Sequence, residues 1–179
     1  HGAPATWALE NHDISRSATR FGGGERGRQR ARAGLLAVLG LPGAAYIYQG
    51  QELGLPDVDV PVHARADPMW IRAGMSRDGA RVPLPWTVAA DNTYGFSSAG
   101  AADPWLPVPA SWGAQSVQRQ RNDPASTLQL VTEALSVRRE LIEKEILSPD
   151  DATSWQIQEN ELLLCERGDR FLLAVALGG

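Results

Sequence analysis

The sequence predicts an α/β protein whose last part is a small antiparallel β region, and three observations support this. The first fifty residues alternate between short β-rich runs and one amphipathic helix pattern. A second helix pattern occupies residues 124–143, and short apolar runs with turn signals follow it. Strand–helix–strand order favours parallel strands, and functional groups in such folds lie at the C-terminal ends of the strands.

The first fifty residues predict a strand, a loop, a helix and a second strand. Thr6 to Leu9 indicates a short buried strand, and "GERGRQRARAGLLAVLG" at residues 24–40 has the period of an amphipathic helix. The apolar stripe of this helix consists of Ala31, Leu35, Val38 and Leu39. Gly40 and Pro42 are a helix stop signal, and "AAYIYQG" from residue 44 predicts the second strand.

Residues 51–122 predict a long connecting segment, because no helical or strand period persists in them. Prolines interrupt the segment repeatedly, and tryptophans occur in "PMW", "LPW", "DPWLP" and "ASW". Structureless segments of this length are uncommon in a compact domain unless they are functional. We expect an ordered segment that is held by tryptophan packing and contains a short helix.

The second long helix is predicted over residues 124–143. Asp123 can cap it, and Pro124 suits the first helical position. Its apolar stripe consists of Leu128, Val131, Leu135 and Ile142. After about residue 150 the pattern predicts three strands: Trp155–Ile157, Leu162–Cys165 and Phe171–Ala176. Residues 167–170 would form a hairpin turn between the last two strands.

Composition narrows the classes of function. The formal net charge of −4 gives the chain no overall attraction for nucleic acid or an anionic membrane. Cys165 is the single cysteine, which excludes an intrachain disulfide and metal ligation by paired cysteines. The longest apolar stretch, residues 33–48, is broken by glycine and proline and is too short to span a bilayer. With no signal-peptide pattern, these features favour a cytoplasmic protein. The first residue is not Met, which suggests a piece of a longer chain.

Asn11, His12 and Asp13 follow the first strand directly and are the first candidates for chemistry. They suit an ordinary turn, since Asn and Asp are turn and capping residues. They equally suit a carboxylate and an imidazole that face a ligand from a strand end. No other histidine has ligand-type spacing to His12, and no G-x-S-x-G motif is present, so neither a metal site nor a serine triad is favoured.

Three further segments carry candidate residues. The glycines at 22–24 and the arginines after them lack a phosphate-loop spacing and fit a solvated helix face better than nucleic-acid binding. In "SRDGARVPLPW", Arg77 and Arg81 suit either a surface salt-bridge loop or donors to hydroxyls or a carboxylate, and the residues alone do not decide between the two. Glu52 in "YQGQELG" is either catalytic or a structural carboxylate that holds its loop, and we favour the structural interpretation.

Four motifs occur in the order found in one enzyme family. They are "WALENHDISR", "LPGAAYIYQGQELGLP", "SRDGARVPLPW" and "DPASTLQLVTEALSVRRE". Together they resemble the α-glucosidases of glycoside hydrolase family 13, in particular the oligo-1,6-glucosidases and the maltose- and sucrose-acting glucosidases. The resemblance covers nearly the whole chain and corresponds to the C-terminal third of that family.

The resemblance implies specific roles for four residues. Asp13 would be the third catalytic carboxylate, which stabilises the transition state. His12 would hydrogen-bond the glucose in the cleavage subsite. Arg77, in the match to R-D-x-x-R, would fix the non-reducing-end glucose. Arg16, which is usual in the family, is carried as a further substrate-binding residue.

The resemblance also implies a fold and a domain organisation. Residues 1–147 would be the C-terminal part of a (β/α)₈ barrel with strands seven and eight, helices seven and eight and a long loop. Strand eight would be Tyr46 to Gln49. Residues 148–179 would begin a small antiparallel β-sandwich domain. No metal or other cofactor is implied, since no Asp-rich calcium loop occurs. The expected partners are a small α-glucoside substrate and the upstream part of the same barrel.

The implied activity is that of a retaining α-glucosidase that releases terminal α-linked glucose from short oligosaccharides. Such enzymes need a nucleophile and a general acid. In this family both lie upstream of the Asn-His-Asp motif, so we expect the 179-residue chain alone to be inactive. Two alternatives stay open: a transglucosidase of the trehalose synthase or sucrose isomerase type, and a non-catalytic fragment. Gln51 stands where Glu is more usual.

Overall fold

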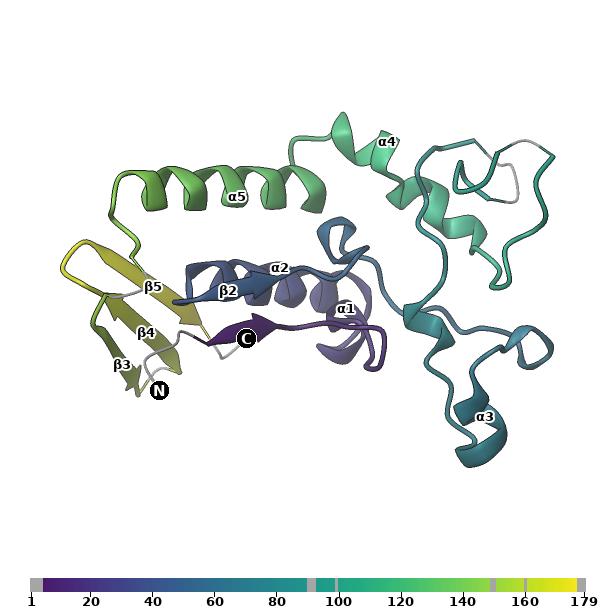
Figure 1. Ribbon diagram of the computed structural model, residues 1–179, viewed down its shortest axis with the longest axis horizontal. Coiled ribbons are helices and arrows are strands. Elements are labelled where there is room, and N and C mark those ends of the chain that lie inside the picture. Colours follow the sequence, from purple (N-terminus) through teal and green to yellow (C-terminus); the bar gives the residue numbers. More distant parts are fainter. Residues whose placement is uncertain (1–4, 90–92, 99, 149–150, 160, 177–179) are drawn as a thin grey trace.

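The computed structural model describes residues 5–89, 93–98, 100–148, 151–159 and 161–176 (Figure 1). Its helices are α1 (Ser17–Arg20), α2 (Gly24–Gly40), α3 (Pro68–Ala73), α4 (Val117–Arg121) and α5 (Thr127–Glu143). Its strands are β1 (Thr6–Ala8), β2 (Ala44–Tyr46), β3 (Thr153–Gln158), β4 (Leu162–Arg167) and β5 (Phe171–Ala176). Short 3₁₀ turns are η1 (Gln51–Leu53), η2 (Val62–Ala64), η3 (Asp78–Ala80) and η4 (Ala110–Gln115).

β1 and β2 form a parallel pair joined through α1 and α2, as the order of elements predicted. Thr6 pairs with Ala44 and Ala8 with Tyr46. Within the described residues this parallel sheet has two strands, so the mixed α/β part is not a closed barrel. The second strand ends at Tyr46, two residues before the "YQG" turn that the sequence had included in it.

α2 packs against α5, and β2 meets both helices at the same core cluster (Figure 1). All four residues of its predicted stripe are buried, which confirms the stripe. Leu35 and Leu39 meet Val131 of α5, and Ala45 and Ile47 pack against them. Burial of such side chains supplies roughly 1.5–3 kcal/mol each.

The C-terminal carbonyls of α2, which have no partner within the helix, are satisfied by two distant arginines. Arg138 of α5 donates to the carbonyl oxygens of Leu39 and Gly43, the second at 2.7 Å. Arg167 of β4 donates to the carbonyl oxygens of Gly40 at 3.2 Å and Ser148 at 2.8 Å. These bonds tie the end of α2 to both α5 and the second sheet.

α1 approaches α2 so closely that residue 27 has no room for a side chain. A Cβ at Gly27 would lie 2.1 Å from the carbonyl oxygen of Ala18. We expect Gly27→Ala to lower the midpoint of thermal unfolding, at a cost of about 1–3 kcal/mol, because backbone must move. Thermal unfolding followed by circular dichroism measures this.

Gly34→Ala, in the same helix, is the matched control. Its added Cβ would meet only side-chain atoms, Leu9 Cδ1 at 3.2 Å and Phe21 Cε2 at 3.4 Å, which can move. Alanine also favours the helix by about 1 kcal/mol over glycine. An unfolding midpoint for Gly27→Ala at or above that of Gly34→Ala would contradict the close packing of α1 on α2.

The long segment between β2 and α4 is ordered, as expected, but aliphatic side chains do most of the packing. Its core consists of Leu53, Leu55, Val60, Val82, Leu106, Trp112 and Val117. Trp112 is buried, whereas Trp86 and Trp105 are exposed. The predicted tryptophan packing is therefore confirmed for Trp112 and wrong for Trp86 and Trp105. The short helix expected here is α3, whose N-cap Asp67 accepts a bond from the Met69 N–H.

α5 begins later than predicted. Ser126 is the N-cap and its Oγ accepts from the Gln129 N–H, while Asp123 accepts from the Ala125 N–H in a separate turn. The prediction of Asp123 as the cap and of Pro124 as the first helical residue is thus wrong, because a serine three residues on offers the same cap. Val131 of the predicted stripe is buried, but Leu135 and Ile142 are exposed.

The three C-terminal strands form an antiparallel sheet in the order β3–β4–β5. Arg167 pairs with Phe171 across the hairpin, and Gly168 has φ +58°, which confirms the predicted turn. Cys165 is buried in β4. Among the described residues no helix combines the length and the apolar character that a membrane span requires.

Candidate functional site

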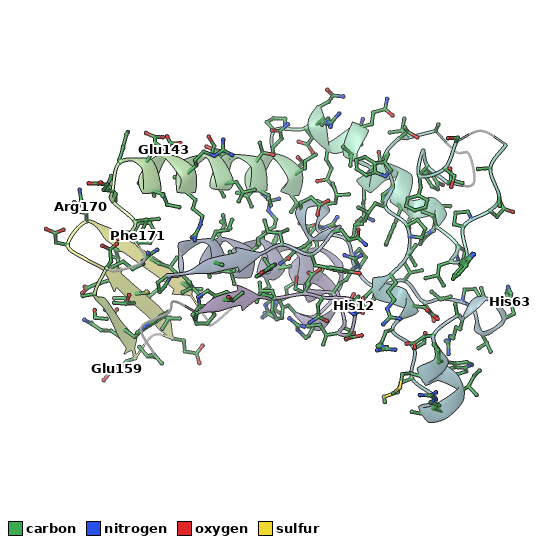
Figure 2. The ribbon with its side chains drawn as sticks, in the orientation of Figure 1. His12, His63, Glu143, Glu159, Arg170 and Phe171 are labelled. Carbon is green, nitrogen blue, oxygen red and sulfur yellow. The ribbon has the colours of Figure 1, made fainter. Side chains whose placement is uncertain are left out.

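The Asn-His-Asp motif forms a turn just past the C-terminal end of β1, and this turn presents Asp13. The Asp13 N–H donates to Asn11 Oδ1 at 2.8 Å, which fixes the local backbone. The Asp13 side chain stays 50% exposed. Figure 2 shows His12 where the chain has left β1. The turn and the functional interpretation are therefore compatible, since the turn holds the carboxylate outward.

Two arginines from the "SRDGAR" loop converge on Asp13, although they lie more than sixty residues after it in the sequence. Arg77 Nη1 donates to Asp13 Oδ1 at 2.7 Å, and Arg81 Nη2 donates to the same oxygen at 3.1 Å. Arg81 Nε also donates to the carbonyl oxygen of His12 at 2.8 Å. Such charge-assisted bonds hold a carboxylate in one orientation.

The His12 ring lies beside the other Asp13 oxygen, with Nε2 3.5 Å from Oδ2. Its side chain is mostly exposed. The ring can therefore reach a ligand that sits on Asp13. We name the group of Asp13, His12, Arg77 and Arg81 the Asp13 cluster.

Asp67 fixes the orientation of Arg77, although no sequence motif pointed to Asp67. Its carboxylate accepts from Arg77 Nε at 2.7 Å, from Nη2 at 2.8 Å and from the Arg77 backbone N–H at 2.8 Å. The Arg77 guanidinium holds the pKa of the Asp67 carboxyl well below its usual range, and Asp67 in turn raises the pKa of Arg77. Both groups are therefore charged at neutral pH, and Arg77 bridges a buried carboxylate and an exposed one.

Asp78 folds the loop that carries both arginines. It is buried and its Oδ2 accepts from the Ala66 N–H at 2.9 Å, the Asp67 N–H at 3.1 Å and Ser76 Oγ at 2.7 Å. The two arginines of the R-D-x-x-R motif thus face Asp13, while the aspartate between them builds the loop. The sequence left two interpretations of this loop open, a surface salt-bridge loop and a loop of arginine donors. Both hold, because the arginines that pair with Asp13 are also the donors of the site.

A cleft of about 540 Å³ opens beside Asp13 and Arg77. Its lining also includes Asp57, Asp59, Arg65 and Met69. Arg65 stacks on Trp70, with its Cζ 4.0 Å from the ring centroid, and lies 3.7 Å from Asp59. Polar groups that converge on an open concave site are what binding of a small hydroxylated ligand needs.

Arg16 lies outside this cleft and is 1% exposed. Its Nη1 donates to the carbonyl oxygen of Gln49 at 2.9 Å and its Nη2 to that of Ala80 at 2.8 Å. The guanidinium also lies 3.6 Å from the buried carboxylate of Glu10. This burial argues against the predicted direct contact with substrate and assigns Arg16 to joining the loops that follow β1 and β2.

Glu52 takes the structural role favoured by the sequence. Its Oε2 accepts from the Gly50 N–H at 2.7 Å. Burial raises the pKa of this carboxyl, while the backbone bonds oppose the rise. The carboxylate holds the turn after β2.

The sequence signalled one of these two further site residues, Arg81, and gave no signal for the other, Asp67. Arg81 completes the R-D-x-x-R spacing, but Asp67 looks like an ordinary helix cap before Pro68 and does serve as one. Within the residues that the structure describes, no three acidic, histidine or cysteine side chains gather where a metal would bind.

Residues 1–147 match the family model of the alpha-amylase catalytic domain. A probable alpha-glucosidase of Rhizobium meliloti (strain 1021) is 37% identical over 140 residues, which is 75% of this chain and 24% of the relative. Maltase A1 of Drosophila melanogaster is 35% identical over 145 residues, which is 78% of this chain and 24% of the relative. The chain thus spans about a quarter of the length of these curated relatives.

Solved structures also match most of this chain. The alpha-glucosyl transfer enzyme XgtA is 32% identical, with a TM-score of 0.76 over 94% of this chain and 31% of that one. A variant of the trehalulose synthase MutB is 23% identical, with a TM-score of 0.75 over 96% of this chain and 34% of that one, and this likeness is one of fold.

Proposed function

Because the chain belongs to the alpha-amylase family of glycoside hydrolases, we propose that it is the part of a retaining α-glucosidase that carries the transition-state-stabilising carboxylate, Asp13. The resemblance drawn from the four motifs is confirmed by the family model and by the alpha-glucosidases among its relatives. The proposed substrates are short oligosaccharides with a terminal α-linked glucose.

The observation that carries the proposal is the position of Asp13. It is half exposed on the wall of a cleft, and two arginines hold it in one orientation. Glycoside cleavage passes through an oxocarbenium-like state in which positive charge grows on the sugar ring. An ionised carboxylate fixed beside that ring binds the transition state more tightly than the ground state, which is the requirement for catalysis.

The neighbouring groups suit the same reaction. His12 donates to a hydroxyl of the glucose in the cleavage subsite, and Arg77 donates to the non-reducing-end glucose. Arg16 does not contact the sugar in this proposal, because it is buried on other partners. The upstream part of the barrel supplies the nucleophile and the general acid. Residues 1–147 would then contribute strands seven and eight, and residues 148–179 would begin the following β domain.

A second candidate is a transglucosidase of the same fold. The 32% identity to an alpha-glucosyl transfer enzyme over 94% of this chain favours it. Hydrolysis and transfer share the first chemical step and differ in the acceptor, which is water or a sugar. The ratio of free glucose to transfer product at high substrate concentration separates the two. A cytoplasmic location remains part of the proposal.

The direct test is hydrolysis of an aryl α-glucoside by the full-length protein. Proton NMR during early turnover should show α-glucose released first, because two successive displacements retain the configuration. The 179-residue chain alone should show no turnover, because the upstream carboxylates do the bond chemistry. Initial release of β-glucose, or no hydrolysis by the full-length protein, would refute the proposal. An upstream reading frame without two family-type carboxylate motifs would favour a non-catalytic fragment instead.

A further inference from the structure

Trp105 is 90% exposed, although the next residue, Leu106, is buried. Leu106 packs into the core with Trp112 and Val117. Side chains therefore alternate inward and outward here, and flanking prolines at positions 104 and 107 restrict the backbone. A well-anchored segment thus holds a large indole ring in water, which is typical of a binding surface.

Two hollows flank the Trp105 ring. The first, of about 570 Å³, is lined by Asp67, Arg81, Phe96, Asp103 and Trp105 among others. The second, of about 520 Å³, is lined by residues that include His63, Tyr94, Asp103 and Trp105. Trp105 and Asp103 belong to both, so they form the ridge between two concave surfaces.

The first hollow meets the Asp13 cluster at Arg81. Arg81 lines this hollow, and its Nη2 lies 3.1 Å from Asp13 Oδ1. Asp67, which orients Arg77, lines it as well. The hollow therefore begins one side chain away from the proposed catalytic carboxylate.

The lining of the first hollow fits a sugar ring. A pyranose has an apolar C–H face and a rim of hydroxyls, and an indole offers a flat apolar surface for the first. Asp103 accepts hydrogen bonds from hydroxyls, and Arg81 is a donor. Asp103 and Arg81 lie among mostly apolar neighbours such as Phe96 in this lining. A sugar ring suits this mixture, because its hydroxyls can bond to the two charged groups while its C–H face covers the apolar ones.

We propose that Trp105, with Asp103 and Arg81, forms a second sugar-binding subsite. It takes a further neutral sugar ring of an α-linked oligosaccharide while the terminal glucose lies at Asp13. This inference rests on the function proposed above, since it extends the same site.

The test compares two substrates in the full-length enzyme: an aryl α-glucoside, with one sugar, and maltotriose, with three. Trp105→Ala should lower kcat/KM for maltotriose about tenfold more than for the aryl glucoside, mainly through KM, because one aromatic packing surface is lost. Trp105→Phe should restore part of the difference. Trp155→Ala is the control, because Trp155 is a half-exposed tryptophan of β3 in the other sheet, and it should change neither value.

Equal losses for the two substrates, with or without a lower unfolding midpoint, would overturn the subsite and indicate that Trp105 packs against other protein. Calorimetric titration with maltotriose in an Asp13→Asn background, in which hydrolysis is slow, measures binding without turnover. In that background, weaker binding when Trp105 is replaced by alanine supports the subsite even if the aryl glucoside is not cleaved, and equal binding overturns it. If the full-length enzyme does not cleave the aryl glucoside, that result contradicts the proposed function and not the subsite.

Discussion

Replacing Asp13 by asparagine in the full-length enzyme should lower turnover of an aryl α-glucoside at least about a hundredfold, the scale of losing one transition-state contact. The amide has nearly the same shape but carries no charge to offset the cation that grows on the sugar. Arg77 and Arg81 would then face the sugar with one negative charge fewer beside them. Steady-state kcat measures the loss.

Asp169→Asn is the matched control for this change. Asp169 is an almost fully exposed aspartate in the turn between β4 and β5, and its carboxylate lies 3.7 Å from Arg170. The same chemical change there should leave kcat within about twofold, because surface pairs of this kind contribute little. If Asp13→Asn also retains wild-type turnover, Asp13 does not stabilise the transition state.

Asp67→Asn should lower kcat/KM by about ten- to a hundredfold, although Asp67 does not line the cleft beside Asp13. In the wild type, Arg77 shares its charge between Asp67 and Asp13. Without the Asp67 carboxylate the guanidinium pairs with Asp13 alone and neutralises the charge that faces the sugar. The loss should therefore appear in kcat as well as in KM.

A double-mutant cycle distinguishes this positioning role from general destabilisation. Asp67→Asn acts through Arg77, so the pair Asp67→Asn and Arg77→Ala should lose little more activity than Arg77→Ala alone. Additive losses would mean that Asp67 affects the reaction by another route.

The pH dependence of stability gives an independent check on the Asp67–Arg77 pair. The folded-state pKa of Asp67 lies below the unfolded value of about 3.9, so the pair stabilises the protein above that pH. The difference in unfolding midpoint between wild type and Asp67→Asn should hold from pH 7 to about pH 4. It should shrink as the pH falls further and the folded carboxyl becomes protonated. A difference that already disappears at pH 5 would contradict the lowered pKa.

Local sequence patterns were sufficient to predict the long helix α2, its end and the C-terminal hairpin. The apolar stripe of α2, the helix stop at Gly40 and the hairpin at Gly168 each depend on residues within a few positions of one another. The same is true of the Asn-His-Asp turn, in which Asn11 and Asp13 bond to each other. Periodicity and turn chemistry report such short-range interactions, and the parallel order of β1 and β2 follows from the helix between them.

By itself, then, the sequence determined the order of elements, the family and the strand end that carries Asp13. Only the tertiary structure decided which distant groups meet it. Arg77 reaches Asp13 across 64 residues, and Asp67 orients Arg77 from a position that looks like a plain helix cap. The same packing buries Arg16 and leaves Trp105 in water. These outcomes depend on the path of a long loop, which is set by the burial of Leu53, Trp112 and their neighbours rather than by any local period.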